Sequence, residues 1–107
     1  AAAAAARARG ALLLGGYDIV LAAQVVYVPS LVGRLVETIA DLLKADGIAL
    51  LYNADVSSSS TQHECRALLD AALMANQLRA TPCELAFPPR CAFPHADAYM
   101  LTITRDQ

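Results

Sequence analysis

Apolar residues along this chain form continuous runs at two places and recur at helical spacing between and after them. Residues 17–23 are almost all apolar and include β-branched residues, which is typical of a strand buried on both faces. From 31 to 43, apolar residues recur at steps of three and four, which predicts a helix packed on a sheet. Residues 48–52 form the second continuous run. The three segments predict a βαβ unit with parallel strands and a right-handed crossover.

Boundary signals accompany both helical stretches. Ser30 is the predicted N-cap of the first helix. Asp46-Gly47 is predicted to end it, because glycine readily adopts the left-handed conformation of a helix C-terminus. Thr61 and Glu64 match a capping box, so a second helix should begin there and end near Asn76. Its apolar face consists of Cys65, Leu68, Leu69, Ala72 and Leu73.

Two alternating patterns, at 81–87 and 98–104, complete the chain. Alternation of apolar and polar residues predicts strands with one exposed face. Pro82 cannot donate a backbone hydrogen bond, so the first of these strands should lie at the edge of a sheet. Their spacing allows antiparallel pairing across the proline-rich connection.

The composition is that of one small folded domain. The chain has 107 residues, of which 57% are hydrophobic and 17% charged, with a net charge of −2. It shows no basic patch, so direct binding of nucleic acid is not expected. Its apolar runs are interrupted well before the ~18–20 residues that a membrane-spanning helix needs, so no membrane association is expected.

Cysteine usage and the N-terminal stretch bear on the compartment. The three cysteines lie far apart, which argues against a disulfide framework and favours reduced thiols in the cytoplasm. Residues 1–16 contain Arg7 and Arg9 and no acid, a composition shared with organelle transit segments, so the mitochondrial matrix is the alternative.

Polar side chains stand where the two continuous runs end. Gln24 and Tyr27 follow the first run, and Asn53 and Asp55 follow the second. Ligands of open α/β sheets bind at the carboxyl ends of parallel strands, so Gln24, Tyr27 and Asn53 are the candidate substrate-binding residues. The alternative is that they only cap the strand ends, with the ring of Tyr27 packed on the following helix. No catalytic residue is assigned.

No metal site is predicted. Zinc sites usually contain tight pairs such as Cys-x-x-Cys, which the sequence lacks. The residues of ligating type are His63, Cys65, Cys83, Cys91 and His95.

The order of elements and the first strand resemble a known family. The order strand, helix, strand, helix, strand, strand is similar to the C-terminal half of a class I, or seven-β-strand, S-adenosylmethionine-dependent methyltransferase. In that family the Rossmann-like sheet has the strand order 3-2-1-4-5-7-6, and strand 7 is antiparallel. Tyr17-Asp-Ile-Val-Leu-Ala-Ala23 resembles most the protein-lysine methyltransferase group, whose members carry Asp-x-x-Tyr directly after this strand. Here Gln24 replaces the acid and Tyr27 is retained.

The resemblance implies a fold. It is an α/β, Rossmann-like methyltransferase sheet comprising two parallel strands with a crossover helix, then a helix and a terminal strand pair whose last strand is antiparallel. Residues 17–107 would form the C-terminal part of one methyltransferase-like domain. Residues 1–16, which begin with six alanines, would be a low-complexity arm or an unassigned lead-in. The first strand would keep an unpaired apolar edge, so an N-terminal half or a partner should complete the sheet.

The resemblance also implies a function. S-adenosylmethionine would be the cofactor, Ala22 and Ala23 would lie beside it, and a protein side chain would accept the methyl group. The glycine-rich turn and the acid that hold the cofactor in the family have no counterpart here, so most of the cofactor site lies outside this chain.

Two functions stay open. The protein is either a methyltransferase of the protein-lysine type or a catalytically inactive methyltransferase-fold subunit, a pseudoenzyme that acts as a structural or binding module in a larger complex. Its partners would accordingly be a protein substrate or assembly partners. Gln24 separates the two hypotheses, because a carboxylate attracts a lysine ammonium and helps to deprotonate it, whereas a neutral amide offers little more than hydrogen bonds.

Overall fold

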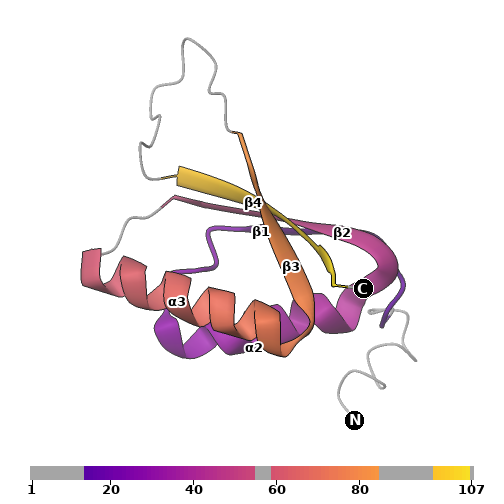
Figure 1. Cartoon of the computed structure of the whole chain (residues 1–107), viewed down its shortest axis with the longest axis horizontal. Coiled ribbons are helices and arrows are strands. Elements are labelled where there is room, and N and C mark those ends of the chain that lie inside the picture. The colour runs from indigo at the N-terminus through magenta and orange to yellow at the C-terminus, as the bar shows by residue number, and fades with distance from the viewer. Residues whose placement is uncertain (1–13, 55–58, 85–97, 107) are drawn as a thin grey trace.

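A computed structural model describes residues 14–54, 59–84 and 98–106 of the chain. The predicted arm at 1–16 and the proline-rich connection at 85–97 therefore lie largely or wholly outside the described residues. The elements follow the predicted order of strand, helix, strand, helix, strand, strand (Figure 1). They are β1 (Tyr17–Ala23), α2 (Pro29–Leu42), β2 (Leu43–Ala54), α3 (Ser59–Ala75), β3 (Leu78–Cys83) and β4 (Ala98–Arg105).

The four strands form one sheet in the order β1-β2-β4-β3. β1 and β2 are parallel, and Val20 to Ala23 lie opposite Ala49 to Tyr52. β4 is antiparallel to both of its neighbours, β2 and β3. The parallel pair with its crossover helix and the antiparallel last strand are confirmed, as is the edge position of the strand that contains Pro82.

Both helices cover the same face of the sheet (Figure 1), and the core lies between the two layers. Alternate residues of each strand point toward the helices, as the pleat of a strand requires. Burying a leucine or isoleucine in this layer contributes about 1.5–3 kcal/mol. The largest buried apolar side chains are Val32, Val36, Ile39, Leu43, Leu51, Leu69 and Ile103.

The core stripe of α2 differs from the predicted one at its edge. Val32, Val36 and Ile39 are buried as expected, but Leu31 is half exposed. On α3, Cys65, Leu69 and Leu73 are buried, whereas Leu68 is exposed. A helix of 3.6 residues per turn can bury only one stripe against a flat sheet, and the outermost members of a wide apolar pattern turn toward solvent.

The ends of α2 correct two predictions. Val28 is the N-cap, Pro29 occupies the first turn, and no side chain caps the helix, so Ser30 lies inside it. The fixed backbone angle of proline suits the first helical position. α2 ends at Leu42, before Asp46-Gly47. Carbonyl groups at its C-terminal end accept hydrogen bonds from Arg105, the last residue of β4. The Arg105 guanidinium donates to the carbonyl oxygens of Ala40 at 2.6 Å and Leu43 at 2.5 Å.

Gly47 lies inside β2 and serves close packing. A Cβ atom at this position would lie 2.8 Å from Leu43 Cδ1 and 2.9 Å from the Tyr17 carbonyl oxygen. The register of β1 on β2 also shifts here, because Tyr17 is opposite Leu43 while Ile19 is opposite Ile48. The glycine therefore lets β1 approach the bulged start of β2, a role that its predicted place at a helix end did not anticipate.

The starts of α3 and β3 also differ from the predicted ones. α3 begins at Ser59, so Thr61 and Glu64 lie inside the helix and do not form a capping box at its start. The helix ends at Ala75, next to the predicted Asn76. β3 covers Leu78–Cys83, three residues earlier than the predicted start of that strand.

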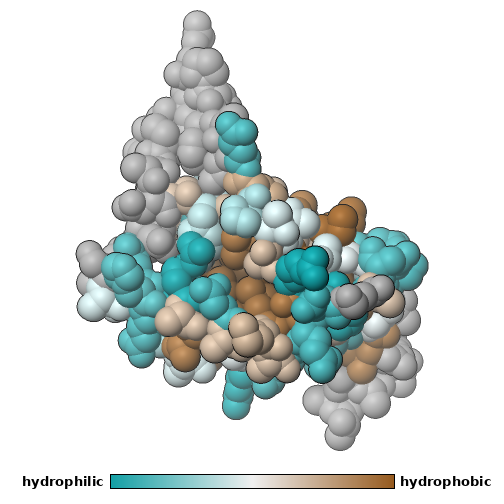
Figure 2. Space-filling model, viewed as in Figure 1, coloured by the Kyte–Doolittle hydropathy of each residue, from teal (hydrophilic) through white to brown (hydrophobic). Residues whose placement is uncertain are grey.

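The second face of the sheet carries no helix among the described residues. Ile19 and Leu21 of β1 are 63% and 75% exposed, and Ile48 of β2 is 41% exposed. β1 also pairs with β2 alone within the described part of the chain. In Figure 2 the hydrophobic atoms near the centre of the view lie where the sheet and the helices meet, with hydrophilic groups on either side, and do not belong to this second face. The predicted unpaired apolar edge of the first strand is confirmed for the described residues.

Candidate functional site

The chain leaves β1 through a short turn, residues 24–28, at the carboxyl end of the parallel pair. The Gln24 N–H donates to the Tyr52 carbonyl oxygen at 2.9 Å, which continues the β1–β2 ladder by one step. Gln24 then adopts φ +57°, a left-handed conformation that non-glycine residues rarely take. This conformation diverts the chain from the sheet toward α2, where the Leu31 N–H donates to the Val28 carbonyl oxygen.

The side chain of Gln24 binds the end of β2. Its Oε1 accepts a hydrogen bond from the Ala54 N–H, and its Nε2 donates to the Ala54 carbonyl oxygen at 3.3 Å. Both ends of the amide are thus used on one backbone residue. These contacts agree with the strand-capping interpretation of Gln24, the alternative to substrate contact.

Asn53 lies beneath the turn. It is 1% exposed, and its Oδ1 accepts from the Val26 N–H at 3.0 Å while its Nδ2 donates to the Val26 carbonyl oxygen at 3.1 Å. A buried polar side chain must be hydrogen-bonded, and the backbone of the turn supplies the partners. Asn53 can influence a ligand through the position of the turn, while direct contact would require the side chain to leave the core.

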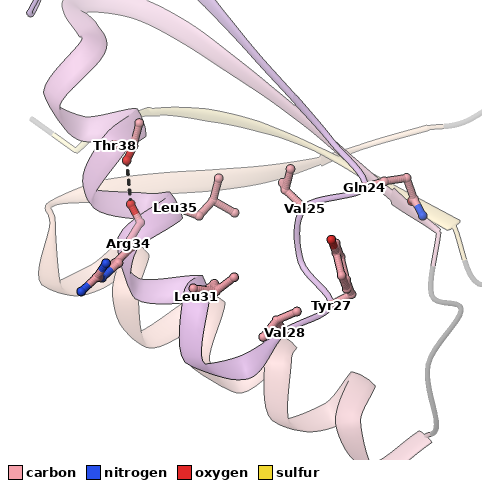
Figure 3. A pocket seen from close by; sticks show the side chains of 8 residues that line it. All are labelled: Gln24, Val25, Tyr27, Val28, Leu31, Arg34, Leu35 and Thr38. Carbon is pink, nitrogen blue, oxygen red and sulfur yellow. Dashed lines mark hydrogen bonds between the residues drawn. The ribbon is translucent and has the colours of Figure 1, made fainter. Parts of the chain in front are cut away.

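An open cavity of about 290 Å³ lies between the turn and the first half of α2. Figure 3 shows Val25 and Val28 opposite Leu31 and Leu35, while the ring of Tyr27 extends from the turn toward the Gln24 end. Tyr27 is 53% exposed, so its ring is not packed away on the helix. The volume is close to the lower limit of small-molecule sites. The lining residues are Gln24, Val25, Tyr27, Val28, Leu31, Arg34, Leu35 and Thr38.

The polar groups of this cavity are few. The Thr38 hydroxyl donates to the Arg34 carbonyl oxygen at 2.8 Å, which occupies it within the helix. The Arg34 guanidinium points away from the cavity in Figure 3. No acidic residue is among the described residues that line the cavity. The phenol of Tyr27 is therefore the polar side-chain group best placed to meet a ligand here.

The structure brings the predicted substrate residues together at one end of the sheet. Gln24 and Tyr27 line the cavity, and Asn53 holds the same turn from below. The predicted cofactor residues point in opposite directions, since Ala22 is buried against the helices and Ala23 is exposed on the open face. Asp55 lies outside the described residues.

The helical half of the cavity was missed by sequence reasoning. Leu31 and Leu35 belong to the apolar residues of 31–43 that the pattern predicts to pack on the sheet, and Arg34 lies between them. With Thr38 they share one side of α2, because residues three and four apart are neighbours on a helix. Their spacing is visible in the sequence, but it does not tell which rows of apolar residues face the sheet and which face the turn.

Neither a cluster of metal-ligating side chains nor a membrane-spanning helix is found in the described part of the chain. There, no three His, Cys, Asp or Glu side chains gather in a way that would hold a metal ion, and Cys91 and His95 lie outside it. None of the helices found there is long and apolar enough to cross a membrane.

Comparison with known proteins gives a likeness in structure. No family model matches the sequence, and no curated protein matches it. The structure is similar to that of the mitomycin 7-O-methyltransferase MmcR, with a TM-score of 0.54 and 17% sequence identity. The likeness covers 95% of this chain and 37% of the length of that protein. At this identity it shows a shared fold, so the chain has the α/β architecture of the C-terminal part of a methyltransferase sheet.

Proposed function

We propose that this chain belongs to an S-adenosylmethionine-dependent methyltransferase and that the turn at 24–28 borders its methyl-acceptor site. The observation that carries the proposal is the sheet order β1-β2-β4-β3 with an antiparallel β4. A hydrogen-bonded turn follows the carboxyl end of β1 in this sheet. Ligands of open α/β sheets bind at that edge. The likeness to a methyltransferase supports the same assignment.

The described residues hold only part of a cofactor site. Ala23 fits such a role, because its small side chain is exposed at the end of β1. Ala22 does not fit direct contact, because it faces the helices. No carboxylate that would hold a ribose is placed at this end of the described sheet. The cofactor therefore needs groups supplied by another segment, and no chemical step is assigned to residues of this chain.

We also propose that a further strand pairs with β1. Ile19 and Leu21 are apolar, exposed and located on the outermost strand of the described sheet. Parallel sheets are normally covered on both faces, and an open apolar edge invites pairing. Either an N-terminal half of the same domain or a partner protein would complete the sheet and bring the remaining cofactor groups.

The finer proposal, transfer to a protein lysine, rests on the resemblance of residues 17–31 to the protein-lysine group. Tyr27 occupies the retained position of that motif and is one of the residues that line the cavity. A lysine ammonium would find no counter-charge among the described lining residues, so its deprotonation would depend on groups from elsewhere.

One observation favours the second candidate function, a catalytically silent binding module. Gln24 takes the position of the motif acid, and its amide is used on the backbone of Ala54. If the polar side chain at position 24 hydrogen-bonds only the backbone, the fold can be retained without methyl-transfer activity.

Calorimetric titration with S-adenosylmethionine of the intact protein, with the segment or partner that completes the sheet present, tests the proposed function. We expect binding, followed by methyl transfer when the protein is incubated with radiolabelled cofactor and protein substrates. Ala23→Trp should weaken binding by about tenfold or more, because a bulky side chain cannot be accommodated against a bound ligand. Ala71→Trp, at an exposed alanine of α3, is the matched control and should bind normally. Absence of binding in the unmutated protein would leave the silent module.

A further inference from the structure

We infer that Gln24 and Asn53 form a reciprocal amide clasp that positions the turn at 24–28, and that neither is a direct acceptor ligand. Each side chain reaches across to the other segment: Gln24 binds the backbone of Ala54, and Asn53 binds the backbone of Val26. The functional half of this inference rests on the proposed function, while the clasp itself rests on the hydrogen bonds.

In the clasp, side-chain amides make the hydrogen bonds that backbone groups make within the sheet. A carboxamide carries a donor and an acceptor, as a peptide group does, so it can make the paired hydrogen bonds of a strand. The backbone ladder ends where the Gln24 N–H meets the Tyr52 carbonyl oxygen. Beyond that step, the two amides join β2 to the turn through Ala54 and Val26. The turn is thus fixed to β2 although its backbone has left the sheet.

The chemistry of the clasp explains the amide at position 24. A carboxylate could accept from the Ala54 N–H, but it would also face the Ala54 carbonyl oxygen at the place where Nε2 now donates. Two acceptors there would repel each other, and a charge would be added beside a carbonyl dipole. Gln24 is therefore the residue type that the clasp requires, whatever the acceptor is.

The clasp determines what the turn presents to the cavity. Val25 and Tyr27 flank the held residue Val26, and both line the cavity opposite Leu31. Fixing one residue of a short turn at both its N–H and its carbonyl group restricts its neighbours as well. A preorganised turn loses less conformational freedom when a ligand binds, so the clasp should raise affinity without touching the ligand.

A glutamine elsewhere in the chain supplies a matched control. Gln77 is exposed and has φ +56°, nearly the same left-handed conformation as Gln24. Its backbone bonds Met74 and Asp106, and no hydrogen bond of its side chain is recorded within the described residues. Gln24→Met and Gln77→Met therefore remove the same amide from the same backbone conformation, with and without a clasp.

The test compares amide hydrogen exchange and S-adenosylhomocysteine affinity in the intact protein. Gln24→Met should speed exchange of the Ala54 N–H group about tenfold, the effect of losing a pair of ordinary hydrogen bonds, and should weaken S-adenosylhomocysteine binding several-fold. Gln77→Met should change neither quantity. Unchanged exchange in Gln24→Met overturns the clasp. Faster exchange with unchanged affinity overturns the positioning role.

Gln24→Glu adds a readout that a general loss of stability would not give. When the introduced carboxyl is protonated it has a donor and an acceptor and restores both bonds; when ionised it loses the donor. Measured relative to the unmutated protein at the same pH, exchange and affinity should return to normal as the pH falls through the pKa of this carboxyl, and a ratio that does not change with pH overturns the inference. Among the described residues, the titratable groups around position 24 are Tyr27, Tyr52 and Arg34. Asp55 lies outside the described residues, so the titration is repeated with Asp55→Asn.

The two proposals can fail separately. If the unmutated protein binds no S-adenosylhomocysteine, the proposed function and the positioning role both fall, while the exchange rates still decide whether the clasp exists.

Discussion

The two outermost strands of the described sheet, β1 and β3, differ in what they expose. On the face away from the helices, β1 carries Ile19 and Leu21, both largely exposed. At the corresponding positions, β3 carries Arg79 and Thr81, and its edge includes Pro82. β3 pairs antiparallel with β4, whereas β1 is parallel to β2.

This difference indicates which side of the sheet is complete. Proline and charged residues on an edge strand oppose further pairing, and antiparallel strands tolerate one face in water. β3 has these properties and can remain a true edge. β1 has the composition of an interior strand, which supports the proposal that a further strand pairs with it.

The largest expected effect is on the free energy of unfolding, and it is measured by comparing two leucines on the neighbouring strands β1 and β2. Leu51 is fully buried under the helices, and Leu51→Ala should lower the free energy of unfolding by about 2–5 kcal/mol in urea titrations. Leu21→Ala should cost less than about 0.5 kcal/mol in the 107-residue chain, because the side chain is exposed. In the protein with a completed sheet, Leu21→Ala should lower the free energy of unfolding by nearly as much as Leu51→Ala does. A small cost in both forms would contradict the proposed extra strand.

A smaller effect concerns the start of β1. Gly47→Ala places a methyl group against the backbone oxygens of Tyr17 and Asp18, so unfolding free energy should fall by about 1–3 kcal/mol. Hydrogen exchange should accelerate in β1 and not in β3. Gly33→Ala is the matched control, because nothing lies within 4 Å of its added Cβ. In the exposed interior of α2 it should stabilise the protein by about 0.5–1 kcal/mol. Equal changes in β1 and β3 would remove the contrast between them.

The smallest effect uses the ion pairs at the two outer strands. Lys44 binds Asp18 at 3.0 Å, and this hydrogen bond and charge raise the pKa of Lys44 above its usual 10.5. The contribution to stability is therefore complete below the usual pKa and is lost as the pH rises through the raised one. Arg79 pairs with Asp106 at 2.6 Å near the other edge and keeps its charge throughout.

Thermal unfolding between pH 9 and 12 measures this difference. Lys44→Met should remove a small part of the stability at pH 9 and none at the upper end of the range. Arg79→Met should have the same small effect at every pH. Both pairs are exposed, so added salt should reduce either effect. A Lys44→Met difference that persists at pH 12 would show that its cause is not the ionised lysine.

The sequence predicted the elements and their arrangement better than their ends. The periodicity at 31–43 identified α2, and the resemblance placed the antiparallel strand. The glycine at 47 was misassigned because a glycine beside an aspartate is a common helix end, and its actual role depends on the backbone of Tyr17. The end of α2 is held in part by Arg105, a contact across 62 to 65 residues that no local pattern contains.

In the candidate site, too, the sequence predicts where residues lie but not which groups they contact. The positions of Gln24, Tyr27 and Asn53 at one edge followed from parallel strands and were correct. Whether each side chain faces a ligand or the scaffold could not be read from residue type, since an amide serves either role. That choice depends on Ala54 and Val26, residues of the opposite segment whose backbone the amides meet.

The central place of β4 in the sheet has a consequence for biosynthesis. β4 is the last described strand to be made, yet it lies between β2 and β3. A nascent chain can pair β1 with β2, but in the described sheet β3 has its partner only after Ala98–Arg105 has left the ribosome. Non-local pairing of this kind is slow and leaves apolar surface open meanwhile. Chaperone binding should therefore be strongest on ribosome-bound chains in which β3 has left the ribosome and β4 has not.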